Sequence, residues 1–207
     1  MGLAALLAVA AFISAASAED EATVLMYVRD GSRDLDRMLV QEVGVMQRML
    51  EDAGYQVALS TPGDEPLATD DRALAPTVKL ADVQIDDYAG IILPCMAPAG
   101  GHAMPARVDE LVAEAVERNL PIAASRGSVS ALARAGALVG KDFAYAGPVS
   151  STERPEFAGG NFVGTGVVRD GLISTAGICP LAARSTGEPD GTFELMNEFI
   201  AALNEAS

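Results

Sequence analysis

The sequence predicts a single α/β domain with a mostly parallel central sheet. Short apolar runs recur at residues 22–28, 90–94 and 121–124, which is typical of strands buried on both faces of a parallel sheet. Between them lie segments whose apolar residues stand three and four positions apart, as in helices that cover a sheet. The 207 residues are enough for one such domain with a sizeable core.

The first half of the chain alternates strand and helix patterns. A helix is predicted over residues 35–53, with Ser32 or Asp34 as its N-cap and Gly54 at its C-terminal end. A second strand follows at residues 55–60, and residues 77–83 are interpreted as a small edge strand or hairpin.

An elbow between a strand and a helix is the central feature of the sequence. An amphipathic helix at residues 105–118 leads into the strand at 121–124, and a helix of small residues begins at Ser128. Gly127 permits a sharp turn between them. The turn is predicted to lift Ser125 out of the carboxyl end of the sheet, where open α/β sheets bind their ligands.

The last part of the chain completes the predicted fold. A short strand is expected within residues 140–147, followed by an irregular segment at 148–160. Asp-Gly between apolar pairs predicts a hairpin over residues 166–175, and residues 192–203 read as a closing helix.

The net charge of the chain indicates which partners it can bind, and its first residues indicate where the protein is located. The net charge of −15 argues against nucleic acid and anionic membrane surfaces as partners. Residues 1–18 are apolar and uncharged and end in small residues, which predicts a signal peptide and an exported, periplasmic or secreted protein. Residues 19–207 then form one domain, with no membrane attachment after cleavage; an uncleaved anchor is the other interpretation.

Glu42 stands out on the predicted helix at residues 35–53. It lies three or four positions from Met38, Leu39, Val45 and Met46, on the apolar stripe. A carboxylate in that place is expected to be partly buried and to need hydrogen-bond donors or a proton.

Taken together, these segments resemble the DJ-1/PfpI family over residues 22–203. The resemblance implies a flavodoxin-like three-layer sandwich, which is usually dimeric, so a homodimer is expected. It rests on an ordered set of motifs: Ala-Gly-Tyr-Gln-Val at 53–57, Ile-Ile-Leu-Pro at 91–94, Asn-Leu-Pro-Ile-Ala-Ala at 119–124, the small-residue helix with Gly and Lys at 131–141, and Val-Val-Arg-Asp-Gly-Leu-Ile-Ser-Thr at 167–175.

The resemblance also assigns roles at the elbow. Catalytic members of the family place a Cys there, often followed by His, beside a Glu on the first helix. Glu42 matches that Glu, whereas Ser125 stands at the position assigned to the Cys and Arg126 at that of the His. Cys95 and Met96 replace the Gly-Gly that usually follows Leu-Pro.

Arg126 suggests an anion site. With Arg29 and Arg33 at the same sheet edge, its guanidinium favours a small carboxylate or phosphate ligand, approached by the backbone of Gly127, Cys95 and Met96. The alternative is that Arg126 pairs with Glu42 or a nearby Asp and closes the site.

The two cysteines allow two interpretations. If Cys95 and Cys179 meet, export favours a disulfide between them. If they do not, Cys95 is a candidate reactive thiol, provided that Arg126 or a helix N-terminus lowers its pKa. The spacing of Cys and His suits no metal site, and no Gly-rich phosphate loop occurs, so no cofactor is expected.

These observations favour an exported DJ-1/PfpI-like protein without the family's cysteine catalysis. It would act as a small-anion-binding, structural or stress-related module, a pseudoenzyme with Ser125 and Glu42 at the family's catalytic positions. The alternative is a hydrolase or glyoxalase/deglycase-like enzyme that uses Cys95, or Ser125 with His102 and Glu42. A third reading is a redox sensor built on the two cysteines.

Overall fold

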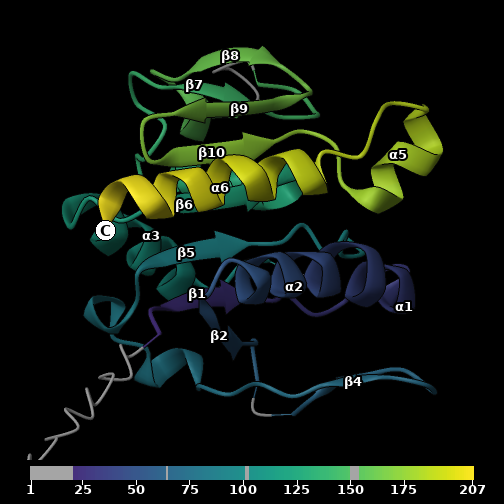
Figure 1. The fold of residues 1–207 in the computed structure, drawn as a ribbon. Helices are drawn as coiled ribbons and strands as arrows, with labels where there is room; N and C mark the ends of the chain where they lie inside the picture. Colours follow the sequence, from purple (N-terminus) through teal and green to yellow (C-terminus); the bar gives the residue numbers. More distant parts are fainter. Residues whose placement is uncertain (1–20, 64, 101–102, 150–153) are drawn as a thin grey trace, which may run out of the picture.

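The computed structural model describes residues 21–63, 65–100, 103–149 and 154–207. Its centre is a six-stranded sheet in the order β2-β1-β5-β6-β10-β9, parallel except at the antiparallel β10–β9 pair (Figure 1). The strands are β1 (Thr23–Tyr27), β2 (Gln56–Ser60), β5 (Gly90–Leu93), β6 (Ile122–Ser125), β9 (Val167–Asp170) and β10 (Ile173–Ala176). The predicted α/β fold with a mostly parallel sheet is confirmed.

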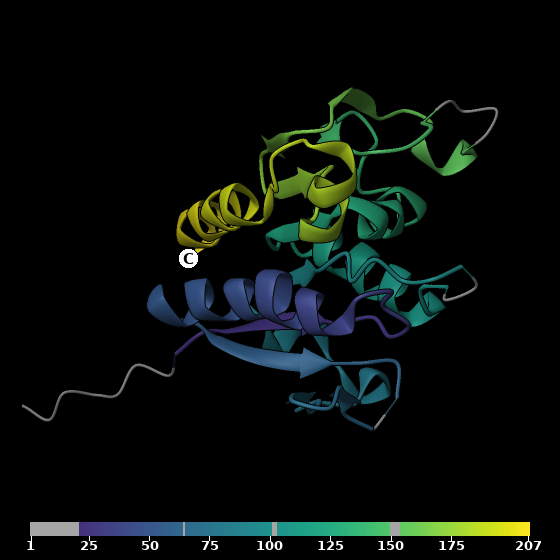
Figure 2. The ribbon, with the colours of Figure 1, turned by 90° about the vertical axis from the view of Figure 1, so that its right-hand side faces the viewer.

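Helices cover both faces of this sheet. On one face lie α1 (Leu35–Met38), α2 (Gly44–Asp52), α5 (Pro180–Thr186) and α6 (Thr192–Ala206), and on the other α3 (Ala106–Glu117) and α4 (Val129–Arg134). Figure 2 shows the resulting three layers edge-on.

Successive β1 side chains explain the layers. Val24 and Met26 pack in the core under α2 and α6, while Leu25 and Tyr27 pack in the core under α3 and α4. Apolar runs of this kind are stable because the strand buries both of its faces.

The helix predicted over residues 35–53 is interrupted. A turn of π-helix, η1 (Leu39–Val43), separates α1 from α2, and the Asp34 side chain caps α1 by accepting a hydrogen bond from the Arg37 amide. The extra residue of a π-turn reorients the side chains that follow, and such turns often lie at functional sites. Glu42 is in this turn.

Several short elements differ from the sequence predictions. Residues 77–83 form no strand: η2 (Leu80–Asp82) is a 3-10 turn, and η3 (Ile85–Asp87) follows it. The hairpin at residues 166–175 is confirmed as β9–β10. Elements that the sequence analysis missed are β3 (Leu67–Ala68), β4 (Ala73–Leu74), β8 (Asn161–Gly164), the 3-10 turn η5 (Pro155–Phe157) and α5.

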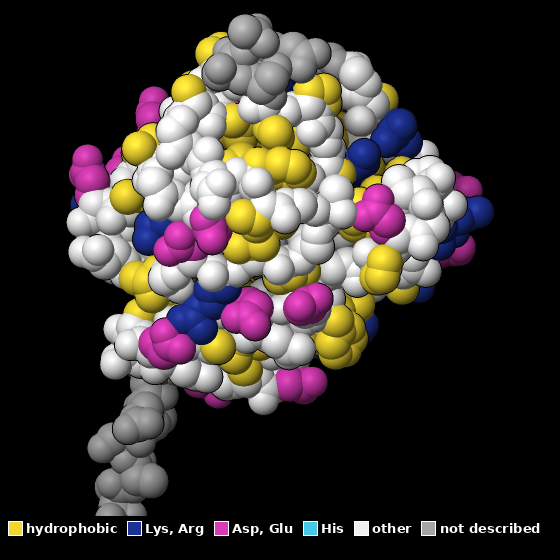
Figure 3. All heavy atoms as spheres, turned by 90° about the horizontal axis from the view of Figure 1, so that it is seen from above, with side chains coloured by type: hydrophobic (Ala, Val, Ile, Leu, Met, Phe, Trp, Pro, Cys, Tyr) yellow, Lys and Arg dark blue, Asp and Glu magenta, His cyan; other side chains and the backbone are white. Residues whose placement is uncertain are grey.

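The strand β8 pairs with β7 (Asp142–Ala144) beyond the edge of the main sheet. Its Phe162 and Val163 side chains are 41% and 49% exposed. Figure 3 views the molecule from this end and shows hydrophobic side chains reaching the surface there. Within the described ranges, no helix combines the length and apolar character needed to cross a membrane.

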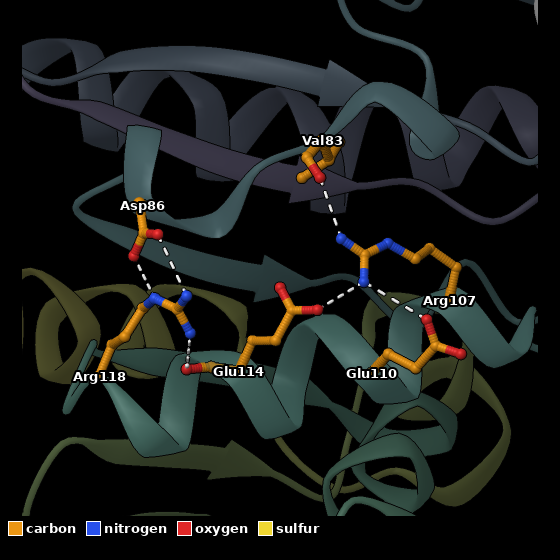
Figure 4. A network of polar contacts seen from close by, with 6 residues as sticks. All are labelled: Val83, Asp86, Arg107, Glu110, Glu114 and Arg118. Carbon is orange, nitrogen blue, oxygen red and sulfur yellow. Dashed lines mark hydrogen bonds and ion pairs between the residues drawn. The ribbon is translucent and has the colours of Figure 1, made fainter.

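An ion-pair network fastens α3 to the segment that contains η2 and η3 (Figure 4). Arg107 contacts Glu114 at 2.6 Å and Glu110 at 3.3 Å, and donates to the Val83 carbonyl at 3.0 Å. Arg118 pairs with Asp86 on the exposed surface. Of these two arginines, only Arg107 donates a hydrogen bond to the carbonyl of a buried residue, Val83.

We therefore expect Arg107→Ala to lower the free energy of unfolding by about 1 kcal/mol, since it removes a charged hydrogen bond to Val83. Arg118→Ala serves as the matched control and should change stability less, because water and salt screen its ion pair. Urea unfolding of both variants measures which of them loses more unfolding free energy. A larger loss for Arg118→Ala would contradict it.

Candidate functional site

Four parallel strands bring the candidate residues to one edge of the sheet. The strands β1, β5, β6 and β10 are neighbours, so the loops after their carboxyl ends meet. These loops carry Arg29, Cys95, Arg126 and Cys179. In addition, the Ser128 hydroxyl donates a 2.7 Å hydrogen bond to the Pro94 carbonyl and joins two of the loops directly.

Glu42 is completely buried beneath the loop after β5. Its carboxylate accepts hydrogen bonds from the Cys95 amide at 3.0 Å and the Met96 amide at 2.9 Å. Met96 and Ala97 both have left-handed backbone, with φ of 54° and 41°, which is strained for residues with side chains. Glu42 thus holds a strained bend, and the expectation that it is buried and needs donors is confirmed.

The structure corrects the position of the elbow. Ser125 is the last residue of β6 and has an extended backbone, with φ −106° and ψ 129°. The left-handed residue is Arg126, with φ 43°. The prediction that Ser125 is lifted out of the sheet is therefore wrong, because the chain turns one residue later.

Ser125 instead lies inside the molecule, beside Glu42. Its side chain is buried, and its hydroxyl favours the charged form of the Glu42 carboxyl. Ser125 Oγ nevertheless makes no hydrogen bond of standard geometry with the described residues. His102, the proposed base for Ser125, lies outside the described residues.

The two cysteines lie together as free, buried thiols. A hydrogen bond joins their side chains, and it is the largest influence on both. It lowers the pKa of Cys179 to about 6, aided by the backbone amides of Ala182 and Leu181 and by the charge of Arg126. The same bond, together with burial and the Glu42 charge, raises the pKa of Cys95 well above its usual value.

This geometry gives Cys95 no support as an activated thiol, because the pKa of Cys95 is raised and not lowered. Arg126 does lower a thiol pKa, as the sequence analysis required, but the thiol is Cys179. Cys95 is the partner that keeps its proton. The one feature of the sequence that could have pointed to Cys179 is the Cys-Pro pair at 179–180, because Pro is common at the first position of a helix. Cys179 is indeed the N-cap residue of α5.

Arginine side chains surround a cavity of about 230 Å³ next to the thiols. Arg29, Arg33 and Arg126 line it, as the sequence analysis expected of residues at one sheet edge. The Nε of Arg126 is buried and has no hydrogen-bond partner among the described residues. The other lining residues are Cys95, Ala97, Pro98, Gly127, Tyr145 and Ala146.

Of the predicted ligand-binding residues, only Met96 is not part of this lining; its side chain packs in the core. Arg126 forms no ion pair with Glu42, whose carboxylate faces the backbone of the neighbouring loop. Within the described ranges, no group of three or more His, Cys, Asp or Glu side chains is placed to hold a metal ion.

Burial makes Glu42 a source of pH dependence. Desolvation, followed by the nearby Cys179 charge, raises its pKa from 4.5 to about 8. The folded protein thus binds a proton that the unfolded chain has released between these pH values. The stability that Glu42 contributes is complete below pH 4.5 and is lost as the pH rises through about 8.

We expect the unfolding free energy of the wild type, minus that of Glu42→Gln, to fall as the pH rises from about 5 to about 8. The slope should be at most about 1.4 kcal/mol per pH unit. The variant side chain cannot ionise, so the difference removes the contributions of groups that do not interact with Glu42. Urea unfolding at several pH values measures it, and a difference that grows with pH would contradict the assignment.

Comparisons with known proteins agree with this fold. The model of the DJ-1/PfpI family matches residues 22–183. A ThiJ/PfpI domain protein from Brachyspira murdochii is 15% identical, with a TM-score of 0.65 and coverage of 89% of this chain and 96% of the other. Drosophila melanogaster DJ-1beta is 20% identical, with a TM-score of 0.60 and coverage of 90% and 95%.

A DJ-1 superfamily protein from Agrobacterium tumefaciens is 16% identical, with a TM-score of 0.66 and coverage of 88% and 90%. At these identities the solved structures support the flavodoxin-like fold alone. A search of the curated proteins finds no match. The match to the family model spans most of the chain, and on this ground the chain belongs to the DJ-1/PfpI family.

Proposed function

We propose that this protein is a small-anion-binding member of the DJ-1/PfpI family that lacks cysteine catalysis at the elbow. The observation that carries the proposal is the cavity into which Arg29, Arg33 and Arg126 converge. Guanidinium groups form charge-assisted hydrogen bonds with carboxylates and phosphates, and a cavity of about 230 Å³ admits only a small ligand.

The elbow itself supports the non-catalytic part of the proposal. The strained turn carries Arg126, whose guanidinium is no nucleophile. Ser125 is buried beside Glu42 and does not line the cavity, and Cys95 retains its proton. A hydrolase that uses either residue has less support than anion binding does.

Export and dimer formation belong to the same proposal. Export is supported by the apolar residues 1–18, which lie outside the described residues. A homodimer is supported by the family resemblance. Intact mass of the exported chain and its elution in size-exclusion chromatography test the two points.

Calorimetric titration with inorganic phosphate and with oxalate tests anion binding. We expect at least one of them to bind, and binding to weaken as salt is added. Arg126→Gln removes a guanidinium whose Nε is buried, and should weaken binding at least tenfold, since a charged hydrogen bond contributes about 1.5–3 kcal/mol. Arg72→Gln, an exposed substitution outside the cavity, is the matched control.

Two results would overturn the proposal. One is that neither phosphate nor oxalate releases or takes up heat or raises the melting temperature of the wild type. The other is that Arg126→Gln and Arg72→Gln bind the anion with the affinity of the wild type.

A further inference from the structure

A second cavity, of about 420 Å³, adjoins the cavity of the three arginines, because Arg33 lines both of them. The second cavity lies between the loop before α1 and the helix α5, and its other lining residues are Asp34, Leu181, Arg184 and Ser185. Figure 1 shows α1 and α5 at the end of the molecule toward which β1, β5 and β10 point. The two cavities therefore lie at the same edge of the sheet and share one guanidinium side chain.

Arg33 is held in place between the two cavities by the loop after β5. The Arg33 amide donates to the Ala97 carbonyl at 3.2 Å, and the Ala99 amide donates to the Gly31 carbonyl at 2.8 Å. The side chain is oriented as well, since Arg33 Nε donates to the same Ala97 carbonyl at 3.4 Å. This contact uses Nε and leaves the two Nη groups, which carry most of the N–H donors of an arginine, for other partners.

The second cavity has an excess of positive charge. Arg184 is an exposed residue near the carboxyl end of α5 and lines the cavity together with Arg33. Asp34 is the one acidic residue among the described lining residues. Its carboxylate already accepts hydrogen bonds from the Arg37 amide at 3.3 Å and from Arg37 Nε at 2.9 Å. The Arg184 charge acts on Asp34 too, but less than Arg37 does, so an anion that enters the cavity can still pair with Arg184.

The remaining groups favour a carboxylate on an aliphatic chain as the occupant of the second cavity. The Ser185 hydroxyl donates to the Ala182 carbonyl at 2.9 Å, and the half-buried Leu181 offers an apolar surface. A phosphate group carries up to two negative charges and is repelled by Asp34 more strongly than a carboxylate, which carries one.

We propose, on the basis of the anion binding inferred above, that the two cavities form one extended site for linear aliphatic dicarboxylates longer than oxalate. One carboxylate binds Arg126 in the first cavity, and the other binds Arg184 in the second. Arg33 lies between them and contacts either group. Guanidinium and carboxylate groups match in shape and form paired, charge-assisted hydrogen bonds, which gives the site its preference for two carboxylates.

Calorimetric titration with two matched series of ligands tests the extended site. The dicarboxylates are succinate, glutarate and adipate, and the monocarboxylates of the same chain lengths are butyrate, valerate and hexanoate. At pH 7 we expect at least one dicarboxylate to bind tenfold or more tightly than the monocarboxylate of its length, because it forms additional charge-assisted hydrogen bonds. The preference should decrease as salt is added.

Variants that replace arginine with glutamine assign the two carboxylates to the two cavities. Arg184→Gln should reduce the affinity for the preferred dicarboxylate to that for the matching monocarboxylate. It should weaken phosphate binding by at most about twofold, since phosphate fits the first cavity and solvent screens the exposed Arg184 charge. Arg33→Gln and Arg126→Gln should weaken the binding of both ligands. Arg48→Gln, an exposed substitution on α2, is the matched control and should affect neither.

Two findings would rule out the extended site, once circular dichroism and melting temperature show that the variants are folded. One is that no dicarboxylate binds more tightly than the monocarboxylate of its length. The other is that the preferred dicarboxylate binds Arg184→Gln as tightly as it binds Arg48→Gln. If phosphate still binds and requires Arg126, the anion cavity remains supported without its extension. If neither phosphate nor any carboxylate binds, both proposals fail.

Discussion

Replacing Glu42 with alanine should lower the free energy of unfolding by about 4 kcal/mol. The carboxylate accepts hydrogen bonds from two buried amides, those of Cys95 and Met96, and each amide left without a partner costs about 1–3 kcal/mol. The loss also leaves a cavity beneath a bend with left-handed backbone at Met96 and Ala97. Urea unfolding at pH 7 measures the change.

Two matched substitutions test this interpretation of Glu42. Glu51→Ala removes an exposed carboxylate from α2 and should change stability by less than about 0.5 kcal/mol. Glu42→Gln keeps the size of the side chain and one acceptor oxygen, so its loss should lie between the two. A Glu42→Ala variant as stable as Glu51→Ala would show that the bend does not depend on the carboxylate.

Gly177→Ala should cost about 3 kcal/mol through steric conflict. A Cβ atom at this position would lie 2.4 Å from the Thr165 carbonyl oxygen and 2.8 Å from Thr165 Cα. Both are backbone atoms, so no change of rotamer relieves the clash, and the backbone must shift. The Gly177 amide also donates to the carbonyls of Thr165 and Gly166, which a shift would weaken.

Gly166→Ala is the matched control, since a Cβ there meets open space. Equal melting temperatures for the two variants would contradict the argument.

The sequence predictions that the structure confirms depend on local patterns of apolar and turn-forming residues. Apolar runs buried on both faces predicted the parallel strands, and Asp170-Gly171 between apolar pairs predicted the β9–β10 hairpin. The place of Glu42 on an apolar stripe predicted its burial, because a helix puts residues three and four positions apart on one face. These features depend on neighbours in the sequence.

The short elements were less accessible to sequence reasoning. The π-turn at Leu39–Val43 leaves the apolar spacing of the helix nearly intact, so periodicity does not reveal it. The helix α5 is only seven residues long, and β8 exposes its side chains and pairs at the margin of the fold. Tertiary contacts stabilise such segments more than their own propensities do.

The chemistry of the site was decided by tertiary structure. The sequence by itself determined an α/β chain with Glu42 buried, arginines at the carboxyl edge and two cysteines after strand ends. It did not determine that the chain turns at Arg126 and not at Ser125, since a one-residue shift in where a strand ends leaves the apolar pattern unchanged. Nor did it determine which cysteine has the lower pKa. That depends on the strand order that brings Cys95 and Cys179 to neighbouring loops, and on the Leu181 and Ala182 amides and the Arg126 charge, which lower the pKa of Cys179.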